Sequence, residues 1–336
     1  MADTDISMVT LAAMQSRAAA LRDEVRHTPV IRLQSQRITD RLAGARIDLK
    51  LECLQHTGTF KARGALNVAL AIPEGDRACG ITAVSAGNHA IAAAWAARKL
   101  GLSAKVVMQS TANPYRVALA RAEGAEIVLK APGAEAFAAA ERLMQDEGRT
   151  FIHPFEGVHT TLGAAGVGLE VMADIADVEA VVVAVGGGGL ISGVAAAVKA
   201  INPDCKVYGA EPETANSMSQ SLAAGRPVTM DSVQTIADSL APPMSLPFSF
   251  AMCQRHVDAV VTISDDAICA GVMLLQEDAK LAVEPAAGAA LAAALGPLRA
   301  KLAGKRICLL ICGANIDAET FGTVLARGKA AAGLLL

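Results

Sequence analysis

The chain has 336 residues, of which 53% are hydrophobic, 19% are charged and only 3% are aromatic. At about 150 residues per domain, this length predicts two domains or one large domain with an inserted lobe. The apolar content excludes intrinsic disorder, and a net charge of −3 without a basic run excludes an electrostatic nucleic-acid binder. No apolar stretch reaches the roughly 18 residues of a membrane span, and the acidic start lacks a signal peptide's basic residues. We therefore expect a soluble, cytoplasmic protein.

Cysteine and histidine spacing shows no metal signature. The seven cysteines form no CxxC pair, which argues against a disulfide framework and a structural zinc site. We interpret most of them as small buried residues in a reducing compartment. The six histidines are scattered, and His153 and His159 lack the spacing of helical metal ligands.

The first half of the chain predicts one α/β lobe. A helix over residues 6–25 and an extended segment over 30–33 come first. Short β-branched runs then alternate with alanine-rich segments, where Pro114 opens a helix and Gly101 and Gly124 close two. This alternation predicts strands over 81–84, 105–108, 126–129 and 150–152, and helices over 88–100, 114–123 and 134–146.

The second half predicts another set of α/β units. Strands are expected over 180–185, 206–210, 257–263 and 307–311, with helices over 190–200 and from 265 onward. The continuous β-branched run at 180–185 is typical of a strand buried on both faces. The proline-bearing segment 240–247 is interpreted as a surface excursion or lid. The predicted fold class is α/β, with two open, twisted, mostly parallel lobes.

Four consecutive glycines, Gly186 to Gly189, lie between a buried strand and a helix. Their backbone amides can approach an anion closely, and the helix dipole favours negative charge there. The run is not a Walker loop, a GxGxxG dinucleotide loop or a GxSxG nucleophile elbow. It predicts a phosphate-binding loop, with a flexible turn as the alternative.

Two further segments carry chemistry. Lys61 lies among small residues and one aromatic, Phe60, at a helix start, where a low pKa would make its amine nucleophilic. The strand-to-helix turn beginning at Ser85 offers amides that can bind a carboxylate. Each has an ordinary alternative, a solvated surface lysine and a capped helix start.

Together, the three segments provide what a pyridoxal-phosphate enzyme of amino acids needs. The motifs are Thr-Phe-Lys-Ala-Arg-Gly-Ala at 59–65, Ser-Ala-Gly-Asn-His-Ala at 85–90, Gly-Gly-Gly-Gly-Leu at 186–190 and Cys-Gly-Ala-Asn at 312–315. With these motifs, in this order, the chain resembles the serine/threonine dehydratases of the fold-type II (tryptophan synthase β-like) pyridoxal-phosphate enzymes. That family also contains serine racemases. The resemblance extends from about Thr28 to Arg327.

The resemblance implies a role for each motif. Lys61 would form the Schiff base with pyridoxal phosphate, Phe60 would pack against the pyridine ring, and Asn88 would hydrogen-bond the phenolic oxygen. Cys312 would face the pyridine nitrogen; because a thiol does not keep that nitrogen protonated, prompt loss of a β-leaving group is favoured over transamination. The amides of Gly186, Gly187, Gly188, Gly189 and Leu190 would bind the phosphate, and Ser85, Ala86, Gly87, Asn88 and His89 the substrate carboxylate.

The implied reaction is β-elimination. The substrate amine displaces Lys61, the freed lysine removes the α-proton, and the β-hydroxyl leaves. The released aminoacrylate then hydrolyses to a 2-oxo acid and ammonia. We predict an ammonia-lyase that acts on L-threonine, L-serine or both.

Three departures from the racemases favour a dehydratase with weak racemase activity. Ala86 replaces the serine that protonates the opposite face of the α-carbon. When the racemases are aligned with this chain on His153 and Pro154, their substrate-facing arginine falls at Ala136. Their asparagine falls at Phe155.

The resemblance also implies an organisation. Residues 1–65 with 156–336 would form the large cofactor-binding domain, and 66–155 a small domain that closes over substrate. A homodimer is expected, and the short distance from the last motif to the end of the chain leaves no room for a regulatory domain. A mono- or divalent cation near Glu211 and the carbonyl of Ala215 is left open, because Ser217 replaces a third, acidic ligand.

Several alternatives remain at this point. A 3-hydroxyaspartate dehydratase would need an extra arginine, for which Arg63 and Arg116 are the candidates. A phenylserine dehydratase would need an open pocket, shaped by Phe155 and residues 244–250. Serine racemase and a non-catalytic binder of pyridoxal phosphate are the others; Asn88 and the carboxylate turn argue against the binder. A nicotinamide dehydrogenase is disfavoured by the missing GxGxxG loop.

Overall fold

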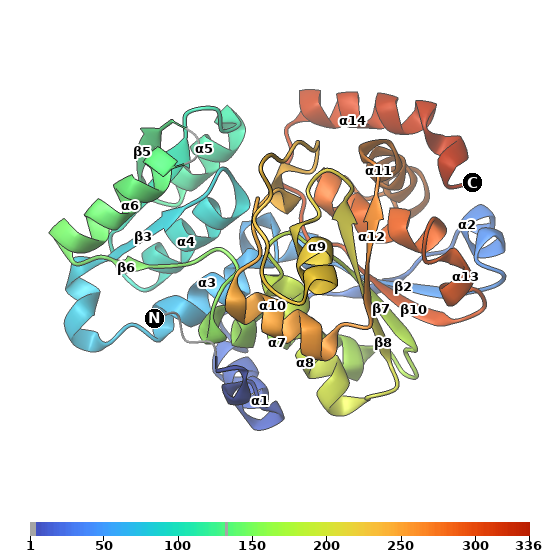
Figure 1. Cartoon of the computed structure of the whole chain (residues 1–336), viewed down its shortest axis with the longest axis horizontal. Helices are drawn as coiled ribbons and strands as arrows, with labels where there is room; N and C mark the ends of the chain where they lie inside the picture. The colour runs from blue at the N-terminus through green and yellow to red at the C-terminus, as the bar shows by residue number, and fades with distance from the viewer. Residues whose placement is uncertain (1–4, 132–133) are drawn as a thin grey trace.

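The structure is a computed structural model of the chain, and it describes residues 5–131 and 134–336. Two α/β lobes lie side by side, with the small lobe on the left of Figure 1 and the large lobe on the right. The described strands are β1 Val30–Arg32, β2 Arg46–Lys50, β3 Ile81–Val84, β4 Ala104–Gln109, β5 Glu126–Lys130, β6 Thr150–Phe151, β7 Ala180–Ala184, β8 Lys206–Pro212, β9 Ala259–Ile263 and β10 Arg306–Leu310. The described α-helices are α1 Leu11–Leu21, α2 Gln36–Arg41, α3 Lys61–Leu70, α4 Asn88–Lys99, α5 Pro114–Ala122, α6 Ala134–Glu147, α7 Val158–Asp174, α8 Gly189–Ile201, α9 Ser217–Ala224, α10 Pro247–His256, α11 Asp265–Ala279, α12 Pro285–Leu295, α13 Arg299–Leu302 and α14 Ala318–Ala330.

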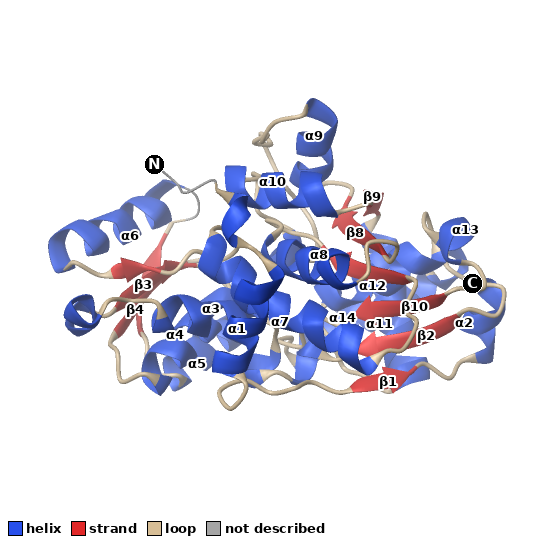
Figure 2. Ribbon diagram, turned by 90° about the horizontal axis from the view of Figure 1, so that it is seen from below, coloured by secondary structure: helices blue, strands red, loops and turns tan. Residues whose placement is uncertain are grey.

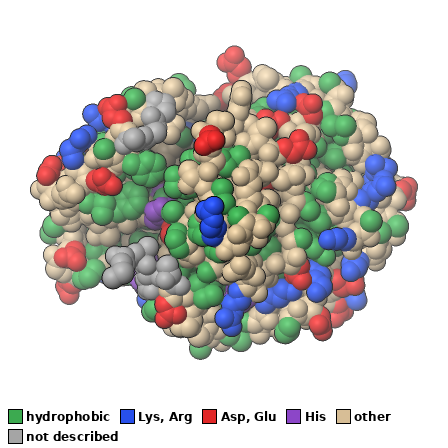
Figure 3. Space-filling model, in the orientation of Figure 1, with side chains coloured by type: hydrophobic (Ala, Val, Ile, Leu, Met, Phe, Trp, Pro, Cys, Tyr) green, Lys and Arg blue, Asp and Glu red, His purple; other side chains and the backbone are tan. Residues whose placement is uncertain are grey.

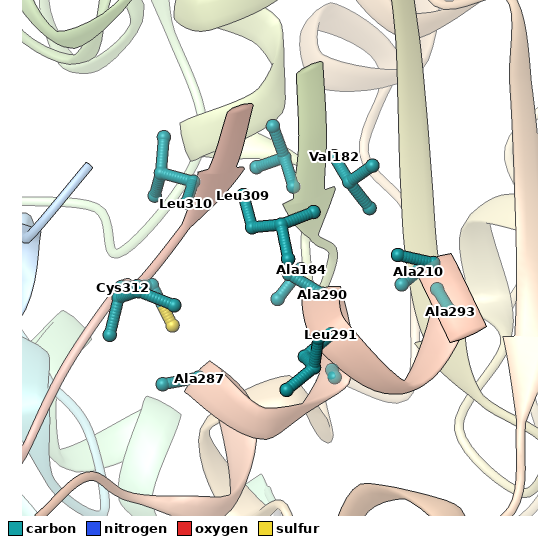
Figure 4. Close-up of a cluster of buried hydrophobic side chains, with 14 of the residues drawn as sticks. Val182, Ala184, Ala210, Ala287, Ala290, Leu291, Ala293, Leu309, Leu310 and Cys312 are labelled. Atoms are coloured by element: carbon teal, nitrogen blue, oxygen red, sulfur yellow. The ribbon is translucent and has the colours of Figure 1, made fainter. Parts of the chain in front are cut away.

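The large lobe is built on a six-stranded sheet with the order β1-β2-β10-β7-β8-β9. Among the described strands of this sheet, only β1 and β2 pair in antiparallel fashion. Every residue of β7 is buried, as its β-branched run predicts. The alanine-rich helix α12 packs against β7, β8 and β10, because its small side chains let the helix approach the strands closely (Figure 4).

The small lobe is built on a four-stranded parallel sheet with the order β5-β4-β3-β6. Alternate residues of β3 and β4 face opposite sides: Ile81 and Val106 join a core with α4 and α5, whereas Val84 and Val107 join one with α6. The two sheets are separate, and helices pack against each of them, as Figure 2 shows. The predicted α/β class with two mostly parallel lobes is confirmed.

Helix α3 joins the two lobes. Ala62 and Leu66 pack in the small-lobe core, whereas Gly64 lies against Thr160 of α7, so close that a Cβ on it would be 3.3 Å from the Thr160 carbonyl oxygen. The predicted boundary between residues 65 and 66 therefore falls inside a helix that packs on both sides. Because α3 begins at Lys61, the reactive amine lies where the lobes meet.

One local prediction was wrong. The helix expected over residues 6–25 is a short 3₁₀ turn, Ile6–Met8, followed by α1, because Thr10 Oγ1 accepts from the amide of Ala13 and begins a new helix there. The segment expected as a surface excursion or lid, 240–247, lies partly at the surface, with six of its eight residues half-buried or exposed. Leu240 and Ser245 are buried in it, and Pro247 already belongs to α10. Within the described residues, we find no helix with the length and apolar character needed to cross a membrane.

Candidate active site

Lys61 lies in a pocket between the lobes. Figure 3 shows histidine atoms in the hollow where the lobes meet. The ammonium of Lys61 donates to the carbonyl of Pro154 at 2.5 Å. Burial lowers the pKa of Lys61 to about 8, although Cys312 and Glu284 oppose the shift. The pocket is lined by Phe60, Lys61, Gly64, Ala65, His89, His153, Pro154, Thr160, Ala164 and Gly189.

The two histidines of this pocket are neutral. Burial lowers the pKa of His89 to about 3 and that of His153 to about 4, and the neighbouring Lys61 charge contributes to both shifts. His89 Nε2 lies 2.8 Å from the Ile152 carbonyl oxygen, so the neutral ring donates its proton there. Any contact of His89 with a substrate carboxylate is therefore left to its backbone amide.

The glycine run forms a tightly packed turn into α8. In the described part of the chain, the amides of residues 186–190 donate to no backbone carbonyl, so they remain available to an anion. Gly188 has φ +91°, a left-handed conformation that favours glycine. A Cβ on Gly187 would lie 2.3 Å from Cγ of Phe155, and one on Gly189 would lie 2.7 Å from its Cα. Packing thus requires glycine at these three positions.

The turn before α4 is organised by its own serine. Ser85 Oγ accepts from the Gly87 amide at 3.0 Å, and the Ser85 amide pairs with the Val107 carbonyl. Helix α4 begins at Asn88, so its first amides, including that of His89, have no helical acceptor. This arrangement suits a carboxylate, and the substrate contacts of residues 85–89 stay predictions.

Asn88 is held between two residues of the large lobe. Its side-chain nitrogen donates to both oxygens of Glu284, at 2.8 and 2.9 Å, and its oxygen accepts from Asn315 at 2.9 Å. Glu284 is 1% exposed, and burial raises the pKa of its carboxyl. We did not single out Glu284 from the sequence. It lies just before α12, where a glutamate followed by proline is an ordinary helix start.

Cys312 lies just beyond β10, close to the start of α12, as Figure 4 shows. Its carbonyl accepts from the Phe60 amide at 3.2 Å, which links the cysteine to the residue before Lys61. Burial raises the pKa of the Cys312 thiol well above its ordinary value, and the Glu284 charge raises it further. The side chain is therefore a neutral thiol, and its place beside a pyridine nitrogen stays a prediction.

Three other residues noted in the sequence have structural contacts. Ala136 is buried with Val107 in the small-lobe core. Phe155 covers the glycine loop and meets His153 edge-on, with 4.7 Å between ring centroids. The guanidinium of Arg63 is held by Glu52 and Glu170.

The Glu211 carboxylate, suggested as a cation ligand, already accepts hydrogen bonds from the protein. Glu211 accepts from the amides of Met218 and Ser219 at the start of α9, and from the Ser219 hydroxyl. The hydroxyl of Ser217 is buried without a hydrogen-bond partner. Among the residues that the structure describes, no three His, Cys, Asp or Glu side chains are grouped to hold a metal ion. A cation near Glu211 and Ala215 stays a prediction.

Comparison with known proteins identifies the family. Residues 21–313 match the family described as pyridoxal-phosphate dependent enzyme. The chain belongs to this family. It is 48% identical to a phenylserine dehydratase from Ralstonia pickettii, over 95% of this chain and 97% of that protein. It is 37% identical to an L-threonine ammonia-lyase from Thermotoga maritima, over 97% of this chain and 80% of that protein.

A solved structure agrees with this family assignment. Maize serine racemase superposes with a TM-score of 0.88 at 31% identity, covering 96% of this chain and 98% of that chain. The fold is that of the fold-type II, tryptophan synthase β-like pyridoxal-phosphate enzymes. Pyridoxal phosphate is the family's cofactor, as the motifs predict.

The residues present fit this cofactor. An aldehyde needs a neutral primary amine, and the pKa of Lys61 is lowered to about 8. A phosphate needs unpaired donors, and the amides at the start of α8 supply them. Gly189, at that helix start, lines the same pocket as Lys61. Lys61, the amides of 186–190, Asn88 and Cys312 are the groups that would hold it.

Proposed function

We propose that this protein is an ammonia-lyase acting on a β-hydroxy-α-amino acid with an uncharged side chain. Water is eliminated first, and the released enamine then takes up water and loses ammonia, so that a 2-oxo acid remains and the net loss is ammonia. The observation that carries the proposal is the position of Lys61. Its amine, with a pKa of about 8, shares one pocket with the start of α8 and the start of α4. One helix start suits a phosphate and the other a carboxylate.

The residues of the chain divide the chemistry among them. Pyridoxal phosphate, when bound, draws electrons from the substrate α-carbon and so eases loss of the α-proton and the β-hydroxyl. Lys61 Nζ is the base for the α-proton, and its lowered pKa keeps the amine able to accept a proton near neutral pH. The neutral rings of His89 and His153 add no positive charge beside it.

Neither of the two arginines considered for a second substrate carboxylate, Arg63 and Arg116, is free in the described part of the chain. Arg63 is paired with Glu52 and Glu170. Arg116 is paired with Asp238 and lies 3.8 Å from Glu284. Both candidates for a 3-hydroxyaspartate site are thus already neutralised, which favours L-threonine and L-serine, the predicted substrates.

3-Phenylserine is the second candidate substrate. The phenylserine dehydratase of Ralstonia pickettii is 48% identical to this chain. Phe155 and His153 form an aromatic pair beside the glycine loop, which can pack against an aryl substituent as well as against a methyl group.

Racemisation is proposed to be weak. Ala86 stands in the carboxylate turn, and a methyl group has no proton to give to the α-carbon. We expect D-serine to form from L-serine much more slowly than pyruvate forms, and chiral chromatography of the reaction mixture measures the two products together.

The deciding experiment is 2-oxo acid release by purified protein with added pyridoxal phosphate. The panel is L-threonine, L-serine, L-threo-3-phenylserine and L-threo-3-hydroxyaspartate. We expect turnover of the uncharged substrates, with kcat/KM for hydroxyaspartate lower by at least about tenfold because its second carboxylate is unpaired. A preference for hydroxyaspartate would contradict the substrate class. Cofactor binding without oxo acid from any substrate would instead support a non-catalytic binder.

The predicted cytoplasmic homodimer is part of this proposal. Family relatives act on small amino acids, and sedimentation equilibrium of the purified protein measures the number of subunits directly.

A further inference from the structure

Arg116, in the first turn of α5, reaches from the small lobe into the large lobe. Its side chain is 7% exposed. Nη1 donates to Asp238 at 2.5 Å, and Nε donates to the carbonyl of Asn315 at 3.0 Å. Nη2 lies 3.8 Å from the buried carboxylate of Glu284. The guanidinium therefore meets three groups of the large lobe at once.

On its own lobe, Arg116 lies against the carboxylate turn. A Cβ on Gly87 would be 2.8 Å from Cδ of Arg116 and 2.9 Å from Nη1. The absence of a side chain at Gly87 thus lets the guanidinium pass directly over the turn. The next residue, Asn88, donates to the same Glu284 that lies near Arg116. The arginine and the turn therefore share one large-lobe acid.

The large-lobe partners are themselves tied to the glycine loop. Ser239, next to Asp238, donates to Glu284 at 3.0 Å. The backbone carbonyl oxygen of Ser239 would be 3.1 Å from a Cβ on Gly186. A second contact holds the same end of α5, since Asn113 at its N-cap donates to Asp317 at the N-cap of α14 at 2.8 Å. The start of α5, in the small lobe, therefore contacts the large lobe through both Asn113 and Arg116.

We propose that Arg116 is a positioning residue that latches the small lobe onto the large lobe and so holds the carboxylate turn, residues 85–89, in its substrate-binding place. This proposal rests on the proposed function, because the proposed function assigns the carboxylate turn to substrate binding. Arg116 does not touch the reacting atoms; it acts through Gly87 and Asn88. Without it, Glu284 loses its nearby positive charge and Asp238 its partner, which frees the small lobe to open.

The test compares Arg116→Gln with Arg116→Lys in the holoenzyme, using Arg121→Gln as a matched control. Arg121 is exposed on the same helix. We expect Arg116→Gln to raise KM by about tenfold, the size of one lost charged hydrogen bond, with a smaller change in kcat. Arg116→Lys should recover most of the loss, because an ammonium still reaches Asp238. Asp238→Asn, at a side chain that is 50% exposed, should raise KM in the same way without a risk to folding.

Hydrogen exchange of the amides in 84–91 supplies a readout that does not depend on turnover. These amides should exchange faster in Arg116→Gln and Asp238→Asn, and no faster in the double variant than in either single one. Equal KM and equal exchange in wild type and Arg116→Gln would overturn the latch. A loss of thermal stability shared by Arg116→Gln and Arg116→Lys, with KM unchanged, would also overturn it. If no variant and no wild-type protein releases oxo acid, the proposed function fails, and the exchange data still decide on the latch.

Discussion

The two lobes each present a helix start at the carboxyl end of a parallel strand, yet they build it differently. In the large lobe, the turn between β7 and α8 is four glycines packed against Phe155, Met218 and residues 239–242. In the small lobe, the turn between β3 and α4 is held by one serine hydroxyl, at Ser85. Both sites offer free amides, as such edges usually do. Several segments pack against the glycines of the first, whereas the second is covered at Gly87 by the side chain of Arg116.

This difference matches two tasks. A cofactor phosphate stays bound through many turnovers, so a loop that neighbouring segments fix from several sides suits it. A substrate carboxylate must enter and leave, so a turn held by one local hydrogen bond and by contacts to the other lobe suits it. Lys61 lies between them at the start of α3, the helix that packs on both lobes.

The largest effect is expected at Lys61, where the two sites meet. Lys61→Ala removes the base and the amine, so kcat should fall by about a thousandfold or more. Oxo acid release measures activity, and the absorbance spectrum measures cofactor attachment. Lys329→Ala, an exposed lysine on α14, is the control and should behave as wild type. Undiminished turnover in Lys61→Ala would remove the lysine from the chemistry altogether.

The next effect tests the rigidity of the glycine loop. In Gly189→Ala, the new methyl would lie 2.7 Å from backbone atoms of Phe155, which have no freedom to move aside. Overpacking of this kind should cost about 3 kcal/mol of unfolding free energy and weaken cofactor retention. Gly75→Ala is the control, because nothing lies within 4 Å of its added Cβ. Urea denaturation compares the two, and a Gly189→Ala protein of wild-type stability would show that the loop is loose.

The pH dependence of cofactor uptake sharpens the role of Lys61. Because burial lowers its pKa to about 8, the amine is protonated below this pH and neutral above it. The rate of pyridoxal phosphate binding to the cofactor-free protein should therefore rise about tenfold per pH unit up to pH 8 and level off beyond. Stopped-flow absorbance measures the rate. A rate that keeps rising to pH 10 would indicate an ordinary lysine.

A variant of Glu284 provides the matched control for this profile. The Glu284 charge raises the pKa of Lys61 against the effect of burial. Glu284→Gln keeps a side chain of the same shape, and the break in the profile should move to lower pH.

Local sequence patterns sufficed for many of the elements, but they missed others, such as β2 and α7, and they did not predict the contacts between the lobes. The alternation of β-branched and alanine-rich runs predicted strands such as β3 and β7, since burial on both faces leaves a direct mark on composition. The same reasoning located Lys61 and the glycine loop. It missed Glu284, which is 196 residues from its partner Asn88 along the chain, because side chains that meet only after both lobes fold share no local pattern. It also missed the commitment of Arg116 to Asp238 for the same reason.

The smallest effect is expected at Ser85, and it tests the small-lobe turn. Ser85→Ala removes the acceptor of the Gly87 amide, a bond of about 1 kcal/mol, so KM should rise about fivefold while kcat changes less. Ser85→Thr keeps the hydroxyl and should restore KM, and Ser110→Ala, at an exposed serine after β4, should leave it unchanged. The comparison of the lobes depends on which parameter Ser85→Ala changes: KM alone, or kcat and cofactor affinity as well. Should Ser85→Ala reduce kcat and cofactor affinity as strongly as Gly189→Ala does, the small-lobe turn would be as much a part of the cofactor site as the glycine loop, and the division into a fixed site and a movable one would fail.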